Sequence, residues 1–248
     1  LPAAKLATAL NYIKSFVAEK EGRNPALACT ECKGGTFNAT DSAGIAFVTV
    51  PTLDKSSARF GGKDIPAAVG FLSQLATEDV EILEHERCTF LRRADGTALL
   101  GVSMWPNAFP NLNLDRNQAP QCQFTVKVSD LLGAFRLLEA FSAADEKAVR
   151  FRFVDGSIAL SMKSASGDAE GDSYTIPCSA HANMDAMDDA TADKFRLPKK
   201  HLEVIAAASG QEDLQFNVLW TPKGGYVRFA FERDGIGYTS IAVWARPQ

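Results

Sequence analysis

The sequence predicts an α+β fold made of two tandem domains, each containing two copies of one βαβββ unit. Three observations support this class: repeated helix-start signals, alternation of apolar and polar residues after each helix, and turn residues between the alternating segments. The clearest copy is the last one, from Phe195 to Arg246. There Pro198 begins a helix, Gly210 ends it, and three alternating segments follow.

The same order of signals occurs four times along the chain. Each copy has proline or serine at a helix start and a glycine-containing turn further on. The helix starts lie in residues 1–6, 65–69, 128–132 and 197–202, and the turns at 34–35, 95–96, 155–156 and 224–225. Four units in 248 residues fit two domains. A stretch rich in Asn, Gln and Pro before Gln121 predicts a boundary that separates domain 1–120 from domain 121–248. Residues 51–62, rich in Ser, Lys and Gly, are expected to form a loop between the first two units.

Each predicted helix has one apolar stripe and an opposite face of small or polar residues. The first helix, from about Ala3 to Glu19, has its stripe at Leu6, Leu10, Ile13 and Val17. The other stripes are Val69, Leu72 and Ala76; Leu131, Phe135 and Leu138; and Leu202, Ile205, Ala206 and Ser209. We expect the helices to lie on one side of continuous antiparallel sheets, which would bury the stripes and align the opposite faces.

Cations lie on or beside the polar faces of three of these helices. They are Lys5, Lys14, Arg136, Lys199 and Lys200, whereas the second helix has an outward face poor in charge. The net charge of −4 and the pI near 5.5 argue against a chain that is basic all over. Aligned helices would still give this acidic chain a positive lining. Arg150 and Arg152 lie on a predicted strand and are expected to face outward.

The composition also limits the class of protein. No apolar run is long enough to span a membrane, and no secretion-signal pattern precedes Leu1, so a soluble cytoplasmic protein is expected. The five cysteines form no disulfide framework, and Cys29 and Cys32 match CxxC without a second ligand pair. The three histidines lie in no nucleophile or metal motif, and the acidic connector that contains Asp185 lacks the pattern of a calcium loop. We therefore expect no enzyme activity, no metal and no cofactor.

Several short segments carry a resemblance to a known family. They are Leu1-Pro2, Arg23-Asn24-Pro25-Ala26-Leu27, Ala39-Thr40-Asp41, Phe109-Pro110-Asn111, Phe195-Arg196-Leu197-Pro198, Gly225-Tyr226-Val227-Arg228-Phe229 and Ile241-Ala242-Val243-Trp244-Ala245-Arg246. In this order they resemble the second and third domains of a bacterial DNA polymerase sliding clamp, over nearly the whole chain. The resemblance implies a processivity factor: a closed ring, with helices inside and sheets outside, that encircles duplex DNA and tethers a replicative polymerase. An ATP-driven loader opens such rings.

The resemblance also bears on assembly. The family's usual subunit has three domains, so a six-domain ring of two-domain chains would be a homotrimer, the arrangement we favour. The alternative is a dimer whose subunit has a further first domain, because no strand precedes Leu1-Pro2 here, whereas the other three units have one.

Family members receive short linear motifs of polymerases and loaders in a hydrophobic pocket between these two domains. The matching positions are Leu27, Thr40, Ile45, Pro110, Ile241, Ala242, Val243, Trp244, Ala245 and Arg246. Two departures predict a different peptide preference. The family's Asp-Gly-x-Arg is Asp41-Ser42-Ala43-Gly44 here, and its Met-Pro-Met is Val243-Trp244-Ala245.

The DNA contact implied by the resemblance is non-specific. A few cations per subunit would bind phosphates in a salt-sensitive way that permits sliding. Two other classes remain open. One is a clamp-fold interaction module, or decoy, that binds clamp-binding peptides without enclosing DNA; the other is an enzyme on a duplicated α+β scaffold, for which the sequence has no catalytic constellation.

Overall fold

The computed structural model describes residues 1–18, 24–53, 57–85, 87–103, 109–110, 118–143, 147–154, 156–163, 173–182, 195–221 and 224–243. Contacts divide the chain into two compact units. The first comprises Leu1–Leu114 with Ala230–Ser240, and the second comprises Asp115–Phe229 with Ile241–Gln248. Because the change of unit after Leu114 falls in residues 111–117, outside the described ranges, the predicted boundary after residue 120 stays a prediction.

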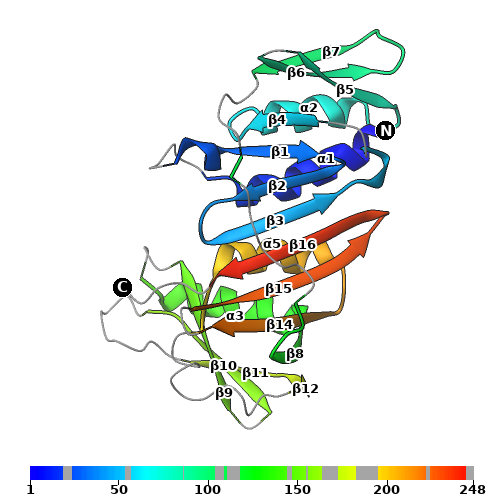
Figure 1. Ribbon diagram of the computed structural model, residues 1–248. Coiled ribbons are helices and arrows are strands. Elements are labelled where there is room, and N and C mark those ends of the chain that lie inside the picture. Colours follow the sequence, from blue (N-terminus) through cyan, green and yellow to red (C-terminus); the bar gives the residue numbers. More distant parts are fainter. Residues whose placement is uncertain are drawn as a thin grey trace. The chain divides into compact units, whose positions relative to one another are not determined.

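In its described residues, the first unit contains two α-helices, three 3₁₀ helices and antiparallel sheets, which Figure 1 shows. Its elements are α1 (Ala3–Ile13), η1 (Lys14–Phe16), η2 (Pro25–Ala28), β1 (Cys29–Lys33), β2 (Thr36–Thr40), β3 (Gly44–Thr49), η3 (Pro51–Leu53), β4 (Ser57–Gly61), α2 (Ile65–Gln74), β5 (Val80–His85), β6 (Cys88–Arg93) and β7 (Leu99–Ser103). One sheet has the order β16–β3–β2–β1–β4, where β16 (Ile236–Val243) contributes residues 236–240 to this unit. The other has the order β5–β6–β7.

The second unit repeats this plan. Its elements are β8 (Cys122–Lys127), α3 (Val128–Phe141), β9 (Ala148–Val154), β10 (Ser157–Ser161), β11 (Tyr174–Pro177), β12 (Ser179–Ala182), β13 (Arg196–Pro198), α5 (Lys199–Ser209), β14 (Asp213–Thr221) and β15 (Gly224–Arg233). The two strand orders are β12–β8–β14–β15 and β11–β10–β9–β13. Gly210 ends α5 in the left-handed conformation, at φ 61°, as its position after the apolar stripe predicts.

Each unit is a pair of repeats that exchange their leading strands. In the second unit, β8 before α3 pairs with β14, and β13 before α5 pairs with β9. In the first unit, β4 before α2 pairs with β1, and Pro2 before α1 bridges to Asp79 beside β5. The Val80 N–H donates to the Leu1 carbonyl oxygen at 2.8 Å. This reciprocal pairing confirms two duplicated βαβββ units in an α+β fold.

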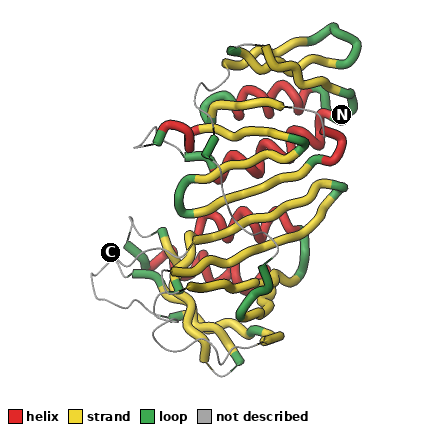
Figure 2. The backbone as a smooth tube through the Cα atoms, viewed as in Figure 1, coloured by secondary structure: helices red, strands yellow, loops and turns green. Residues whose placement is uncertain are grey.

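The helices of each unit lie on one side of its strands (Figure 2). The stripe of α1 is buried as predicted at Leu6, Leu10 and Ile13. On the facing side of the first sheet, Phe37 and Phe60 are fully buried. In the second unit, the rings of Phe124 and Phe216 stack with centroids 4.7 Å apart. Alternating strand residues therefore meet a helical stripe in both cores.

Three local predictions were wrong. Residues 51–62, predicted as a loop, contain η3 and β4. The first helix ends at Ile13 and continues as the 3₁₀ turn η1, although Val17 at the end of the predicted stripe is still buried. On α2 the buried residues are Ile65, Ala68 and Leu72, while Ala76 is exposed beyond Gln74, the last helical residue. No helix of the described part of the chain is long and apolar enough to cross a membrane.

Candidate functional site

Three of the predicted cations are exposed on the helical segments. Lys14 lies in η1, Arg136 in the middle of α3, and Lys200 at the second position of α5. Arg136 follows the buried Phe135 and precedes the buried Leu138 by two residues, so its side chain leaves the helix on the side away from the core. An anion such as a phosphate can reach these three side chains from solvent.

Lys199 is held differently, because two carboxylates surround its ammonium group. Its Nζ lies 2.9 Å from Oε1 of Glu203, one turn further along α5, and 3.2 Å from Oε2 of Glu139 on α3. The side chain is only 12% exposed. Burial by itself would lower the pKa of Lys199, but the hydrogen bonds and charges of Glu203 and Glu139 raise it above its ordinary value. The ion pair between Lys199 and Glu139 therefore links α5 to α3.

Lys5 and the second helix also differ from a simple positive lining. Lys5 is half-buried on α1, and its Nζ lies near the β15–β16 turn, where a Cβ added to Gly235 would be 3.1 Å away. The sequence of α2 has no charged residue between Ile65 and Gln74. In the first unit, Lys14 is thus the predicted cation with the most exposed position.

The predicted peptide-pocket positions on β2 and β3 form a tight, ordered turn. Thr40 and Ile45 are cross-strand partners, and Thr40 Oγ1 donates to the Gly44 carbonyl oxygen at 2.8 Å. The Asp41 carboxylate accepts from the N–H groups of Ala43, at 3.1 Å, and Gly44, at 2.9 Å. This Asx-type turn uses the carboxylate of Asp41 for backbone bonding.

The remaining pocket positions belong to both units. Leu27 in η2 and Pro110 are half-buried, and both belong to the first unit. On β16, Ile241 and Ala242 are buried and Val243 is half-buried. All three residues belong to the second unit. Trp244, Ala245 and Arg246 lie outside the described residues. The pocket that these positions would form stays a prediction.

Solved structures resemble the whole chain. A DNA polymerase sliding clamp from Pseudomonas aeruginosa matches with a TM-score of 0.78 at 14% identity, covering 100% of this chain and 65% of that chain. A sliding clamp from Bartonella birtlesii bound to griselimycin matches with a TM-score of 0.79 at 14% identity, with 100% and 65% covered. The β sliding clamp of C. crescentus gives 0.74 at 14% identity, with 100% and 64% covered. The fold is the sliding-clamp fold.

The likeness to clamps lies in the structure. No protein-family model matches the sequence, and no curated protein does. The chain spans about two thirds of the length of these clamp chains. This chain shares its backbone fold with the sliding clamp from Pseudomonas aeruginosa, but at 14% identity most of its side chains differ from those of that protein.

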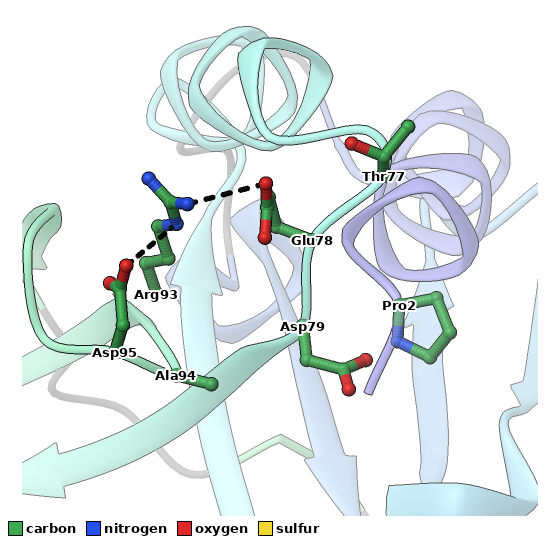
Figure 3. A pocket seen from close by; sticks show the side chains of 7 residues that line it. All are labelled: Pro2, Thr77, Glu78, Asp79, Arg93, Ala94 and Asp95. Atoms are coloured by element: carbon green, nitrogen blue, oxygen red, sulfur yellow. Dashed lines mark ion pairs between the residues drawn. The ribbon is translucent and has the colours of Figure 1, made fainter.

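A surface pocket of about 330 Å³ is a feature of this clamp fold that sequence reasoning missed (Figure 3). It lies in the first unit, beside the pairing of Pro2 with Asp79. Its lining consists of Pro2, Thr77, Glu78, Asp79, Arg93, Ala94 and Asp95. Arg93 pairs with Glu78 at 3.2 Å and with Asp95 at 3.3 Å. These ion pairs occupy Glu78, Arg93 and Asp95 with one another.

The CxxC cysteines of this clamp fold are buried on β1. Burial raises the pKa of Cys29 to about 11 and that of Cys32 to about 12. Both thiols are therefore protonated at neutral pH, which makes them poor nucleophiles and poor metal ligands. Among the residues that the structure describes, no three His, Cys, Asp or Glu side chains are grouped in a way that could hold a metal ion.

Proposed function

We propose that this protein is a DNA sliding clamp, a processivity factor that encircles duplex DNA and tethers a replicative polymerase. The observation that carries this proposal is the clamp fold over the entire chain, with TM-scores of 0.74 to 0.79. The duplicated units, with helices on one side of the strands, supply the surface that such a role requires (Figure 2). The role needs no catalytic group, and we propose none.

The DNA contact is assigned mainly to Lys14, Arg136 and Lys200, because these cations are exposed. Lys5 and Lys199 are weaker contributors, since Lys199 already binds two glutamates and Lys5 is half-buried near a turn. Few phosphate contacts per subunit give weak, non-specific and salt-sensitive binding. Such binding allows a protein that encloses DNA to move along it.

Charge reversal tests the DNA contact. Lys14→Glu, Arg136→Glu and Lys200→Glu should each reduce retention on circular DNA. Each should also make the decrease of log affinity with log salt shallower, by about one unit of slope for every phosphate that the variant no longer binds. Retention is measured by gel filtration of protein loaded on nicked circles at several salt concentrations.

The matched control is Lys33→Glu. Lys33 is an exposed lysine at the end of β1, and its strand partner is Thr36. Because Lys33 lies on a strand rather than on a helix, this variant should retain DNA like the wild type. An equal reduction in the control and the helix variants would show that net charge, not the helix surface, governs retention.

Ring assembly is proposed to use two of the edge strands of the described sheets, β7 and β11. Apolar side chains are exposed at or near both edges, including Leu99 on β7 at 58% and Tyr174 on β11 at 43%. Leu137 and Phe141, one turn apart on α3, are 48% and 68% exposed. Joining unlike edges produces a closed ring when the rotation closes, and three two-domain subunits supply six domains.

Partner binding is assigned to the pocket positions Leu27, Thr40, Ile45, Pro110 and 241–246. Deleting residues 243–248 should abolish binding of the cognate polymerase's clamp-binding peptide and leave assembly unchanged, because the tail would form a pocket wall. Trp244→Ala should cost about 1 to 3 kcal/mol if the indole contacts the peptide. Calorimetric titration with the peptide measures the affinity of both variants. Equal affinity of the wild type, Trp244→Ala and the deletion variant would show that the peptide binds outside this pocket.

A further inference from the structure

Two glutamates lie among the cations of the second unit that are assigned to DNA. They are on α3 and α5, which contact each other (Figure 1). Glu139 follows Arg136 by three residues on α3, and Glu203 follows Lys200 by three residues on α5. Helix residues three apart are neighbours on the helix surface. Each carboxylate therefore lies within one turn of a cation that is assigned to DNA.

The remaining cation of this group, Lys199, bridges the two carboxylates. Its Nζ lies 2.9 Å from Oε1 of Glu203 and 3.2 Å from Oε2 of Glu139. The side chain of Lys199 is 12% exposed, whereas that of Glu139 is 66% exposed. A phosphate that approaches these helices therefore meets the carboxylate of Glu139 more readily than the ammonium group of Lys199.

The two glutamates also reduce the local charge. Arg136, Lys199 and Lys200 contribute three positive charges, and Glu139 and Glu203 contribute two negative charges, which leaves one positive charge. Salt screens exposed charges from each other only beyond about 8 to 10 Å, so neighbours one helical turn apart still interact. These helices should therefore bind phosphates more weakly than their number of cations suggests.

We propose that Glu139 competes with DNA phosphates for Lys199 and thereby limits how tightly the second unit holds DNA. The proposal rests on the proposed clamp function and adds the control of its affinity. Carboxylates and phosphates both accept charge-assisted hydrogen bonds from an ammonium group. Lys199 can thus exchange Glu139 for a phosphate without losing an anionic partner. Such an exchange is reversible at each contact, which suits a protein that must release phosphates in order to slide.

The first test removes the charge of Glu139 and keeps its size. Glu139→Gln should increase retention of the full chain on nicked circular DNA. It should also make the decrease of log affinity with log salt steeper, by about one unit of slope for every phosphate that Lys199 reaches. For each such contact, lowering the salt from about 200 mM to about 50 mM should strengthen binding about threefold more than in the wild type. Thermal melts establish that the variant is folded.

Two further variants separate competition for Lys199 from a general effect of charge. Adding Lys199→Gln to Glu139→Gln should remove the steeper salt dependence, because the released cation is then absent. Glu81→Gln is the matched control: it removes the same charge and releases an arginine, Arg92, on strands β5 and β6. Arg92 follows the buried Leu91, so it points away from the core, and this control should retain DNA like the wild type.

Sequestration of Lys199 can be measured without DNA. Acylation by an amine-reactive ester, followed by mass spectrometry, should label Lys199 more slowly than Lys127, whose side chain is 58% exposed. Glu139→Gln should increase the labelling of Lys199 relative to Lys127. Equal labelling of the two lysines in the wild type would contradict the proposal.

Three results of the retention experiment would also overturn it. They are unchanged retention of Glu139→Gln, an equal gain in Glu81→Gln, and a salt dependence of Glu139→Gln that persists when Lys199→Gln is added. If neither the wild type nor Glu139→Gln is retained on DNA, the proposed clamp function itself is wrong. Retention of the wild type with no effect of Glu139→Gln would leave the clamp function standing and exclude only the competition.

Discussion

At the scale of single residues, the side chain of Tyr12 holds a distant part of the chain in the first unit. Its hydroxyl lies 2.6 Å from Oγ of Ser240, and both side chains are buried. Its ring meets Tyr238 edge-on with centroids 4.9 Å apart. The tip of the β15–β16 hairpin, residues 230–240, is thereby attached to α1 of the first unit.

Removing the hydroxyl of Tyr12 should destabilise the protein. Tyr12→Phe leaves the Ser240 hydroxyl buried without this partner, and we expect the free energy of unfolding to fall by about 1 to 2 kcal/mol. Ser240→Ala added to Tyr12→Phe should recover part of that stability. Urea denaturation measures both. Thr8→Ala removes an exposed hydroxyl on the same helix, bonded to the Ala4 carbonyl oxygen, and should change stability little.

The difference between wild type and Tyr12→Phe should also depend on pH. Burial raises the pKa of Tyr12 above its ordinary value near 10 in the folded state. Above pH 10 the unfolded tyrosine ionises while the folded one stays neutral, so the wild type loses stability as pH rises, and phenylalanine does not. The stability gap between the two proteins should narrow above pH 10. A constant gap would show that Tyr12 is not buried in solution.

At the scale of elements, the approach of β4 to the segment after α1 depends on a glycine. Gly62 follows β4, and its N–H donates to the Ala28 carbonyl oxygen at 2.8 Å. A Cβ at Gly62 would lie 2.7 Å from Cγ1 of Val17 and 3.3 Å from the Ala28 oxygen. Val17 and Ala28 therefore fill the space that the Cβ atom of any other residue at position 62 would need.

Two glycine substitutions test this packing against each other. Gly62→Ala should cost about 1 to 3 kcal/mol, because the added methyl group overpacks a filled site. Gly70→Ala on α2, where nothing lies within 4 Å of the added Cβ, should stabilise by about 0.5 to 1 kcal/mol through helix propensity. Thermal unfolding compares them. A neutral Gly62→Ala would mean that Val17 has room to move.

At the scale of the whole molecule, assembly decides whether DNA is enclosed. The wild type should elute as a trimer in size-exclusion chromatography with light scattering. Phe141→Ser and Leu99→Ser should each shift it to smaller species, because they remove exposed apolar side chains near the proposed edges. Leu83→Ser, on β5 away from these edges, is the control. A monomeric wild type would instead favour a clamp-fold interaction module that binds partner peptides without encircling DNA.

Local signals in the sequence were sufficient for the repeated βαβββ plan, because helix stripes, strand alternation and turn residues act over a few positions. The stripe of Leu6, Leu10 and Ile13 and the stop at Gly210 were both predictable in this way. The fold class followed from repetition of these signals. The predicted cations and pocket positions came from the resemblance and from helix faces, and their roles stay predictions.

Only the tertiary structure decided which groups meet across the chain. Glu139 and Lys199 are far apart in sequence, and their ion pair exists because α3 and α5 contact each other. The polar composition of residues 51–62 did not predict the strand β4. The hydrogen-bonded pairing of β4 with β1 stabilises this strand, and that pairing is a tertiary contact. Arg196 faces Arg150 through the register of β13 on β9. Such pairings depend on strand exchange between repeats, which no local period in the sequence encodes.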